Sequence, residues 1–213
     1  MFYCLSHTGS NRYKYIFSTS EYYVFEDRIC EKCGRNVRIP RIINFPVQFY
    51  AEGGKRYPDY FQITTPIERH CGMIVSEKAL QAFTENEISG FESMPIEILE
   101  SCGKNLIKPT DIPQYYYITV QGTVSLDYQA MHYRKKNICD TCGGFSWSRE
   151  KIGESFLDAA TWSGHDLCKL TDYPNVFICT QKVIEVIKKN GLKCFAQRSE
   201  HDIFRGLRAE KIC

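Results

Sequence analysis

Long apolar runs are absent from this 213-residue sequence. No window approaches the 18 consecutive apolar residues that a membrane-spanning helix needs, and the N-terminal segment has no apolar stretch behind a basic start. We therefore expect a soluble, cytoplasmic protein without a membrane partner. A dominant charge is also absent, because 27 Lys and Arg oppose 25 Asp and Glu and leave a net charge of +2. This balance argues against a protein whose main task is to bind nucleic acid.

Common catalytic motifs are missing as well. The sequence contains no GxGxxG, GxxxxGKS/T, GxSxG or HExxH pattern, so the usual signatures of nucleotide binding and hydrolysis are not there. His70 and Cys71 resemble a base beside a nucleophile, but adjacent residues on extended backbone point to opposite sides. His165 beside Asp166 resembles a base with its orienting carboxylate, although Asp166 has a structural explanation given below. We therefore expect a protein that is not an enzyme.

Cysteine, in contrast, is abundant. The chain has 11 cysteines, and their odd number and scattered spacing do not look like a disulfide framework. Four of them form two CxxCG motifs, at 30–34 and 139–143. Two thiolates three positions apart around a tight turn can point at one ion, and the following glycine tolerates the backbone conformation that this needs. The sequence therefore predicts a structural Zn²⁺ bound by Cys30, Cys33, Cys139 and Cys142.

Other interpretations of these motifs stay open at this point. Thioredoxin-like redox sites would need each motif to begin a helix after a buried strand, whereas the flanking residues look extended. Disulfides or simple buried thiols are a second alternative. An iron–sulfur cluster takes the same four thiolates, and zinc is preferred because nothing else in the sequence indicates electron transfer. About 100 residues separate the two motifs, far more than the ~15–20 of a compact zinc ribbon, so the ion would join distant parts of the chain.

The sequence also contains an internal repeat. Residues 73–92 align with residues 177–196 without a gap, at a constant offset of 104. Each segment predicts an apolar strand, then a helix with one apolar face, capped by the hydroxyl of Ser76 in one case and Thr180 in the other. Gly191 is expected to end the second helix, whereas the first has a glutamate in that place.

The repeat extends upstream, where DYFQIT at 59–64 matches DLCKLT at 166–171. This match predicts one shared structural role for Asp59 and Asp166, such as a turn or a cap. We therefore predict an α+β fold in one compact unit, 1–213. It is built of two repeat-related halves, approximately 1–105 and 106–213, each with a CxxCG zinc knuckle and a strand-helix unit, joined by one Cys4 metal site.

Four further segments carry secondary-structure predictions. Residues 21–29 and 115–124 are rich in Tyr, Val, Ile and Thr and predict strands. Residues 95–102 and 148–160 are predicted to be helices, the second of them amphipathic.

Charge differs between the two repeat units. Residues 77–100 contain six Glu and a single Lys, for a net charge of −5, whereas residues 181–196 are basic. Since the fold repeats but the charge does not, the fold is not the cause of the acidic excess. A solvated helix face is one explanation. The other is a surface that steers a basic partner, for which the candidate residues are Glu85, Glu87 and Glu92.

The paired CxxCG motifs, together with the run DLCKLTDYPNVFICTQKVIEVIKKNGLKCF at 166–195, resemble the double-CxxCG motif family of bacterial immunity proteins. Two departures from the family are that Lys169 stands for its usual base and Val183 replaces an aromatic residue at the helix start. The resemblance implies a non-catalytic protein that binds and neutralises a cognate polymorphic or contact-dependent toxin. The alternatives are a zinc-stabilised nucleic-acid-binding or regulatory module and an enzyme with redox cysteines.

Overall fold

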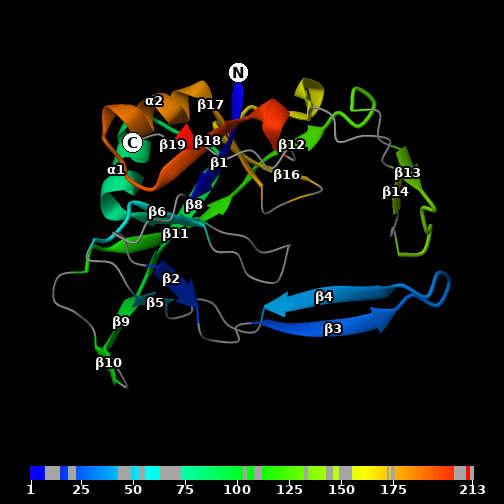
Figure 1. The fold of residues 1–213 in the computed structure, drawn as a ribbon, viewed down its shortest axis with the longest axis horizontal. Helices are drawn as coiled ribbons and strands as arrows, with labels where there is room; N and C mark the ends of the chain where they lie inside the picture. Colours follow the sequence, from blue (N-terminus) through cyan, green and yellow to red (C-terminus); the bar gives the residue numbers. More distant parts are fainter. Residues whose placement is uncertain are drawn as a thin grey trace.

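The structure, a computed structural model, describes residues 1–7, 15–18, 23–42, 49–52, 56–62, 73–102, 105–107, 112–131, 134–142, 146–148, 155–171, 173, 176–203 and 210–211. It is a mixed α+β protein. In Figure 1 both helices lie together at the upper left of the main body, and two hairpins extend to the right as an arm.

Both helices form where the repeat predicts them. Helix α1 (Glu77–Glu85) follows strand β7 (Met73–Ser76), and helix α2 (Gln181–Lys189) follows strand β17 (Phe177–Thr180). The expected cap is confirmed for Ser76, whose hydroxyl accepts the N–H of Ala79 at 3.2 Å. The cap expected from the Thr180 hydroxyl is wrong, because α2 begins after Thr180 without a side-chain cap hydrogen bond.

The two helices end in the same way. The residue after each C-cap lies in the left-handed region, with φ 51 at Glu87 and φ 57 at Gly191. The next amide then bonds back to a carbonyl inside the helix, from Ile88 at 2.9 Å and from Leu192 at 3.1 Å. These bonds satisfy carbonyls that the helix end would leave without partners. The first helix thus ends with a left-handed turn that usually contains glycine, although Glu87 occupies that position.

Two sheets contain the strands of the two predicted repeat units. The first has the order β6-β7-β11-β8, with β6 at Tyr60–Gln62, β8 at Phe91–Ile96 and β11 at Tyr115–Val120. The second has the order β15-β12-β16-β17-β1-β18-β19, with β1 at Phe2–His7, β12 at Gly122–Leu126, β15 at Leu157–Asp158, β16 at Leu167–Leu170, β18 at Phe195–Ser199 and β19 at Glu210–Lys211. Four central strands of the second sheet therefore stand in the same positions as the four strands of the first.

The strand register is also the same in both sheets. One row of directly opposed residues across the first sheet is Phe61, Ile74, Tyr117 and Met94. The corresponding row of the second sheet is Cys168, Ile178, Cys4 and Arg198. The offset between Ile74 and Ile178, and between Met94 and Arg198, is the same 104 residues that align the sequences.

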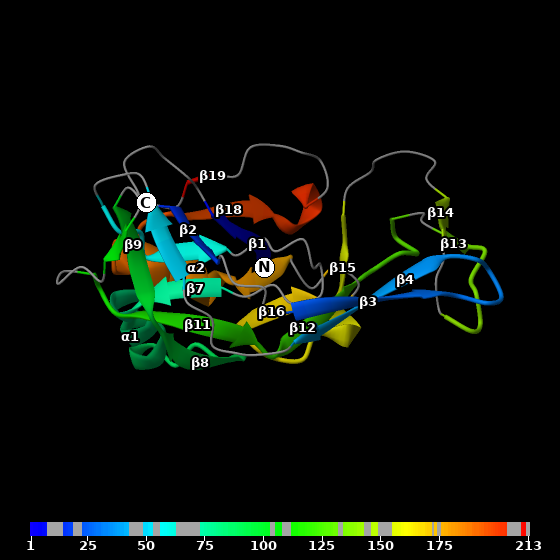
Figure 2. The same ribbon diagram turned by 90° about the horizontal axis from the view of Figure 1, so that it is seen from below.

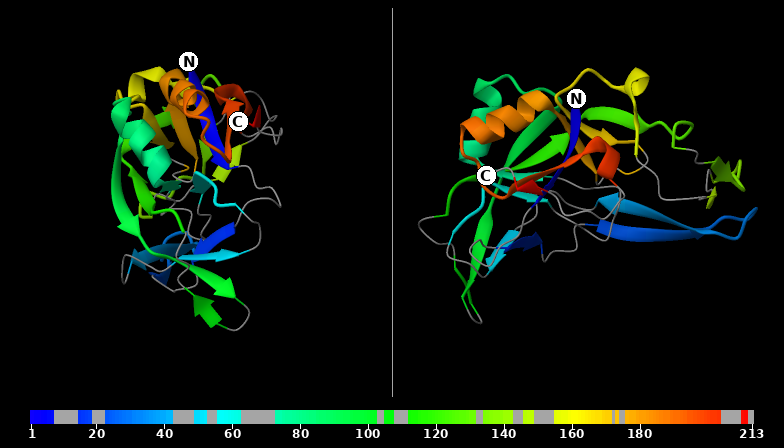
Figure 3. Two further views of the ribbon diagram at one scale, coloured as in Figure 1. Left: turned by 90° about the vertical axis from the view of Figure 1, so that its left-hand side faces the viewer. Right: turned by 45° about the horizontal axis from the view of Figure 1, so that its top comes forward.

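The largest apolar core lies between the helices and both sheets. It contains buried side chains of both helices and of strands from both sheets, among them Leu5, Val75, Phe83, Ile184 and Phe195. The rings of Tyr60 and Phe195 stack with centroids 4.5 Å apart, so the two sheets share this core directly. Figure 3 shows α1 and α2 side by side on this face. The predicted apolar face of each helix is confirmed.

Smaller elements complete the fold. A third sheet has the order β10-β9-β5-β2, with β2 at Tyr15–Ser18, β5 at Phe49–Glu52, β9 at Ile98–Cys102 and β10 at Asn105–Ile107. The arm consists of two antiparallel hairpins, with β3 at Tyr23–Ile29, β4 at Asn36–Ile42, β13 at Arg134–Lys136 and β14 at Ser146–Ser148. The prediction of a strand at 21–29 is confirmed from Tyr23 onward, and the strand predicted at 115–124 is divided between β11 and β12.

The helix predicted at 95–102 is wrong, because this segment contains the end of β8 and the whole of β9. Ile96 and Ile98 are buried, whereas Glu97 between them is exposed. This alternation has the period of a strand rather than a helix.

The helix predicted at 148–160 is also wrong in its described part. That part contains the last residue of β14, strand β15 and the start of a 3₁₀ turn at Ala159–Thr161. Leu157 pairs with Leu126 across the sheet, and the carboxylate of Asp158 accepts the N–H of Ala160 at 3.1 Å. Sheet pairing and a local aspartate cap therefore decide the conformation here. Residues 149–154 of this prediction lie outside the described residues.

Candidate metal centre

Each CxxC motif forms the tip of one hairpin of the arm. The first follows β3 and the second follows β13. In the first knuckle the N–H of Gly34 bonds to the carbonyl of Cys30 at 2.8 Å, and Gly34 has φ 67. This conformation favours glycine, which explains why the motif continues with that residue. Figure 2 shows the two hairpins converging at the end of the arm that is away from the helices.

The structure brings the four predicted cysteines together. Their sulfur atoms all lie within 4.8 Å of one another. Two of the distances are 3.7 Å, between Cys30 Sγ and Cys139 Sγ, and 3.6 Å, between Cys33 Sγ and Cys142 Sγ. A tetrahedral zinc ion with Zn–S bonds of about 2.3 Å holds its sulfurs about 3.8 Å apart. The four sulfurs therefore fit one tetrahedral metal ion, and the soft thiolate set suits zinc.

Backbone amides favour the metal-binding form of the first cysteine in each knuckle. The N–H of Cys33 is the largest of the causes that lower the pKa of Cys30. In the second knuckle the N–H of Cys142 is the largest cause, and the pKa of Cys139 falls to about 6. A thiol with a lowered pKa is more readily the thiolate that binds a metal.

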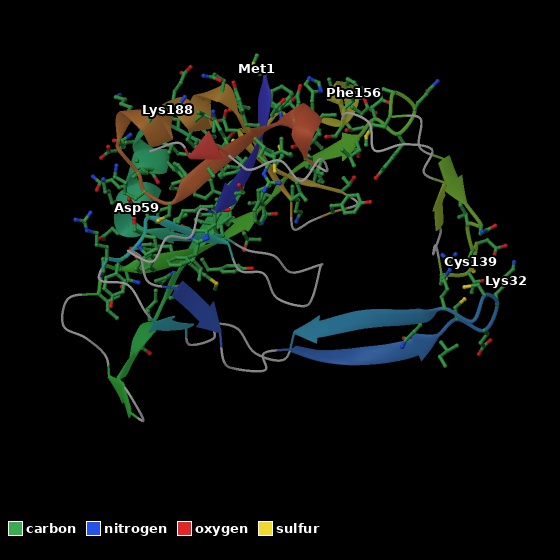
Figure 4. All side chains as sticks on the ribbon, in the orientation of Figure 1. Met1, Lys32, Asp59, Cys139, Phe156 and Lys188 are labelled. Carbon is green, nitrogen blue, oxygen red and sulfur yellow. The ribbon has the colours of Figure 1, made fainter. Side chains whose placement is uncertain are left out.

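An ion pair joins the two knuckles beside the sulfurs. Lys32 Nζ donates to both carboxylate oxygens of Asp140, at 2.7 and 2.6 Å. The hydrogen bond from Lys32 is the main reason why the pKa of Asp140 is lowered. Both side chains are exposed, so water limits what the pair contributes to stability. Figure 4 shows Lys32 and Cys139 together at the end of the arm, away from Asp59 and Lys188.

The sequence reasoning overlooked two apolar side chains at this tip. Ile29 and Ile138 are 73% and 62% exposed, and each directly precedes the first cysteine of its motif. Their identical place in the two motifs was the available signal. The Lys32–Asp140 pair was also missed, because nothing local indicates that two residues so far apart in the chain will meet.

The candidate acidic residues lie on the body instead. Glu85 is in the last turn of α1, Glu87 occupies the left-handed position after the helix, and Glu92 lies on β8. All three are exposed. The structure therefore places them apart from the cysteine cluster.

The shared structural role predicted for Asp59 and Asp166 is confirmed. Asp59 accepts a hydrogen bond from the Ser76 hydroxyl at 2.7 Å, and Asp166 accepts one from the Thr180 hydroxyl at 2.8 Å. Each carboxylate thus connects the strand before the helix to its neighbour in the sheet. His70 and Cys71, the other pair considered, lie outside the described residues.

No protein-family model matches the chain, and a comparison with curated proteins gives no match. Within the described part of the chain, none of the helices has the length and apolar character needed to cross a membrane.

Proposed function

We propose that this chain is a non-catalytic immunity protein that binds and neutralises a cognate bacterial toxin in the cytoplasm of the cell that makes both. The resemblance of the paired CxxCG motifs and residues 166–195 to the double-CxxCG immunity family supports this function. A Cys4 set supports a structural role for zinc, because four sulfurs fill all the positions of a tetrahedral ion and leave none for water or substrate. The function then depends on a binding surface rather than on the metal.

The observation that carries this proposal is the unfavourable placement of two acidic residues. Glu85 lies at the negative end of the α1 dipole, where an acidic side chain costs about 0.3–1 kcal/mol. Glu87 has φ 51, a conformation that costs a side chain about 1 kcal/mol or more. The corresponding positions after the 104-residue offset are Lys189 and Gly191, which suit both local preferences. Local preferences are most often overridden at functional sites, so we assign this acidic surface to partner binding.

The test uses the full-length protein and the toxin domain encoded beside its gene. Reversal of the pair, E85K/E87K, is expected to lower the association rate at least tenfold at low salt and much less at high salt, because steering between charges is screened. The matched control for either single reversal, E85K or E87K, is E185K, which makes the same change in net charge at an exposed site on α2. Adding E92K to the double variant should deepen its defect. Equal rates for the single reversals and E185K would remove the acidic surface from the proposal.

A second candidate function has one observation in its favour. The two hairpin segments of the arm, 23–42 and 134–148, contain eight Lys and Arg against four Asp and Glu. This local excess suits a zinc-stabilised nucleic-acid-binding or regulatory module. Fluorescence titration with single- and double-stranded DNA across a range of salt concentrations distinguishes the candidates, since binding to phosphates weakens steeply with salt.

We also propose that the two halves are copies of one unit. The same strand order, the same register, the same helix ends and one CxxCG motif in each half support this relation.

A further inference from the structure

The first strand that lies wholly within each half pairs in the sheet of the other half. Strand β1 belongs to residues 1–105, yet it pairs with β17 and β18 of the second half. Strand β11 belongs to residues 106–213, yet it pairs with β7 and β8 of the first half. The expected halves therefore do not form separate sheets, because each sheet is completed by a strand from the other half. Figure 1 shows β1, in dark blue, beside β17 and β18 near the other end of the colour scale.

The two exchanged strands also correspond in sequence. FYCLSH in β1 and YYYITV in β11 both begin with two aromatic residues and continue with an aliphatic residue and a hydroxyl residue at the fourth and fifth positions. Phe2 and Tyr115 take the same place in the register, since Phe2 is opposite Thr180 and Tyr115 is opposite Ser76. Each half thus has an equivalent strand near its start, and this strand pairs in the sheet of the other half.

Two aspartates make a second reciprocal contact between the halves. The second carboxylate oxygen of Asp59 accepts the N–H of Lys193 at 2.7 Å, and that of Asp166 accepts the N–H of Ser89 at 3.1 Å. Lys193 and Ser89 are themselves related by the 104-residue offset. Each half therefore supplies one carboxylate and one amide, in the manner of a two-fold symmetric interface.

The cysteine cluster makes a third reciprocal contact. Each half contributes one CxxC knuckle, so each supplies two of the four clustered sulfurs that a closed tetrahedral site needs. The strands and aspartates lie in the body, whereas the cysteines lie at the end of the arm, so the contacts hold two separate parts of the molecule.

We infer that the molecule is an internal dimer, in which two copies of one unit are obligate partners that exchange their first strands. The surface that each unit presents is fitted to a second copy of the same unit. The continuous chain fixes the two copies in a 1:1 ratio, and an intact chain between residues 107 and 112 is then not needed to keep them paired. This inference depends on the proposed repeat and is independent of any toxin.

The first test cuts the chain of the full-length protein between the two copies. A specific protease site is inserted between residues 107 and 112, the folded protein is cleaved, and native mass spectrometry is recorded with zinc and again after a chelator. The expected result is a 1:1 complex of the two fragments in both conditions, because the exchanged strands and the aspartates do not need the metal. Separation with zinc present overturns the inference. Separation only after chelation also overturns it, because the metal alone would then hold the fragments together.

The second test reports the strand exchange itself. Tyr3 lies directly opposite Cys179, so Y3C in the cleaved, zinc-loaded protein should form a disulfide with Cys179 under mild oxidation. Peptide mass spectrometry, which separates this product from any link between the two CxxC motifs, should show residues 3 and 179 joined. The matched control is Y3S, which offers no thiol at that position. Should Y3C fold poorly, V75C/Y116C probes the other exchanged strand, since Val75 is opposite Tyr116. A folded variant that gives no more joined product than Y3S overturns the exchange.

Discussion

Glu87 adopts, at φ 51, the left-handed backbone conformation that Gly191 adopts at φ 57 after the corresponding helix. Both residues allow the next amide to bond back into the helix, so the conformation is required at both places. Only glycine takes it without steric cost. The glutamate at this position therefore lowers the stability of the fold relative to glycine.

This relationship predicts a trade-off in the variant E87G. The free energy of unfolding, measured by urea denaturation, should rise by about 0.5–1 kcal/mol, because the left-handed strain disappears. The association rate with the toxin domain should fall. G191E is the reciprocal control and should lose about as much stability. A destabilised E87G protein would show that the Glu87 side chain supports the fold instead.

The cysteine cluster predicts the metal content and the effect of its removal. The purified protein should contain about one equivalent of zinc by elemental analysis, and C139S should contain none, because three sulfurs do not close the tetrahedron. Hydrogen exchange should then show faster exchange in the arm hairpins of C139S and little change in α1, α2 and their sheets, since the site lies at the end of the arm.

C179A is the control for this experiment. Cys179 is fully buried in the main core, away from the cluster, so its replacement should affect core packing and leave the metal content unchanged. Bound iron in place of zinc would indicate the cluster alternative. Full zinc content in C139S would mean that the metal is held elsewhere.

Gly122 predicts a large steric penalty. A Cβ atom built there would lie 2.1 Å from the backbone oxygen of Leu167 and 2.9 Å from Cys168 Sγ. Since a backbone oxygen cannot move aside easily, G122A should lower the free energy of unfolding by about 3 kcal/mol. G164A is the control, with φ 83 but no atom within 4 Å of the added carbon, and it should lose only about 1 kcal/mol. Similar losses in both variants would show that the backbone at Gly122 yields.

Local patterns were sufficient to predict the two strand-helix units and the four cysteines that lie together. The apolar spacing of α1 and α2 and the hydroxyl before each helix are local signals, and a CxxCG knuckle is complete within five residues. The helix predicted at 95–102 failed because short apolar segments do not separate the two periods well until burial is known. Buried Ile96 and Ile98 flanking exposed Glu97 show the strand period only in the folded chain.

The strand exchange could not be predicted in the same way. Pairing partners are set by tertiary packing. The sequence of β1 is compatible with either sheet, because Cys179, which lies opposite Tyr3, corresponds to Val75 in the other sheet. The halves 1–105 and 106–213 follow from sequence similarity, which says nothing about which sheet receives the first strand. The contact between Lys32 and Asp140 is non-local for the same reason.

Asp166 predicts a dependence of stability on pH. Partial burial alone would raise its pKa, but the hydrogen bonds from the Ser89 N–H, the Thr180 hydroxyl and the Ser89 hydroxyl, with the charge of Lys182, outweigh burial, and the pKa is lowered from its ordinary value of 3.8. A carboxylate whose pKa is lower in the folded state adds stability above its unfolded pKa. That contribution is lost as the pH falls through the folded pKa, which lies below 3.8.

The variant D166N isolates this contribution. At pH 7 it should be less stable than the parent protein by about 1–3 kcal/mol, because the hydrogen bonds to a charged acceptor are weakened. The difference should shrink as the pH falls below about 4, where the parent carboxylate becomes protonated. Urea denaturation at a series of pH values measures it, and E185Q, which removes one negative charge at an exposed position of α2, controls for the change in net charge. If the difference in free energy of unfolding between D166N and the parent stays constant down to pH 2, the negative charge of Asp166 does not contribute to stability.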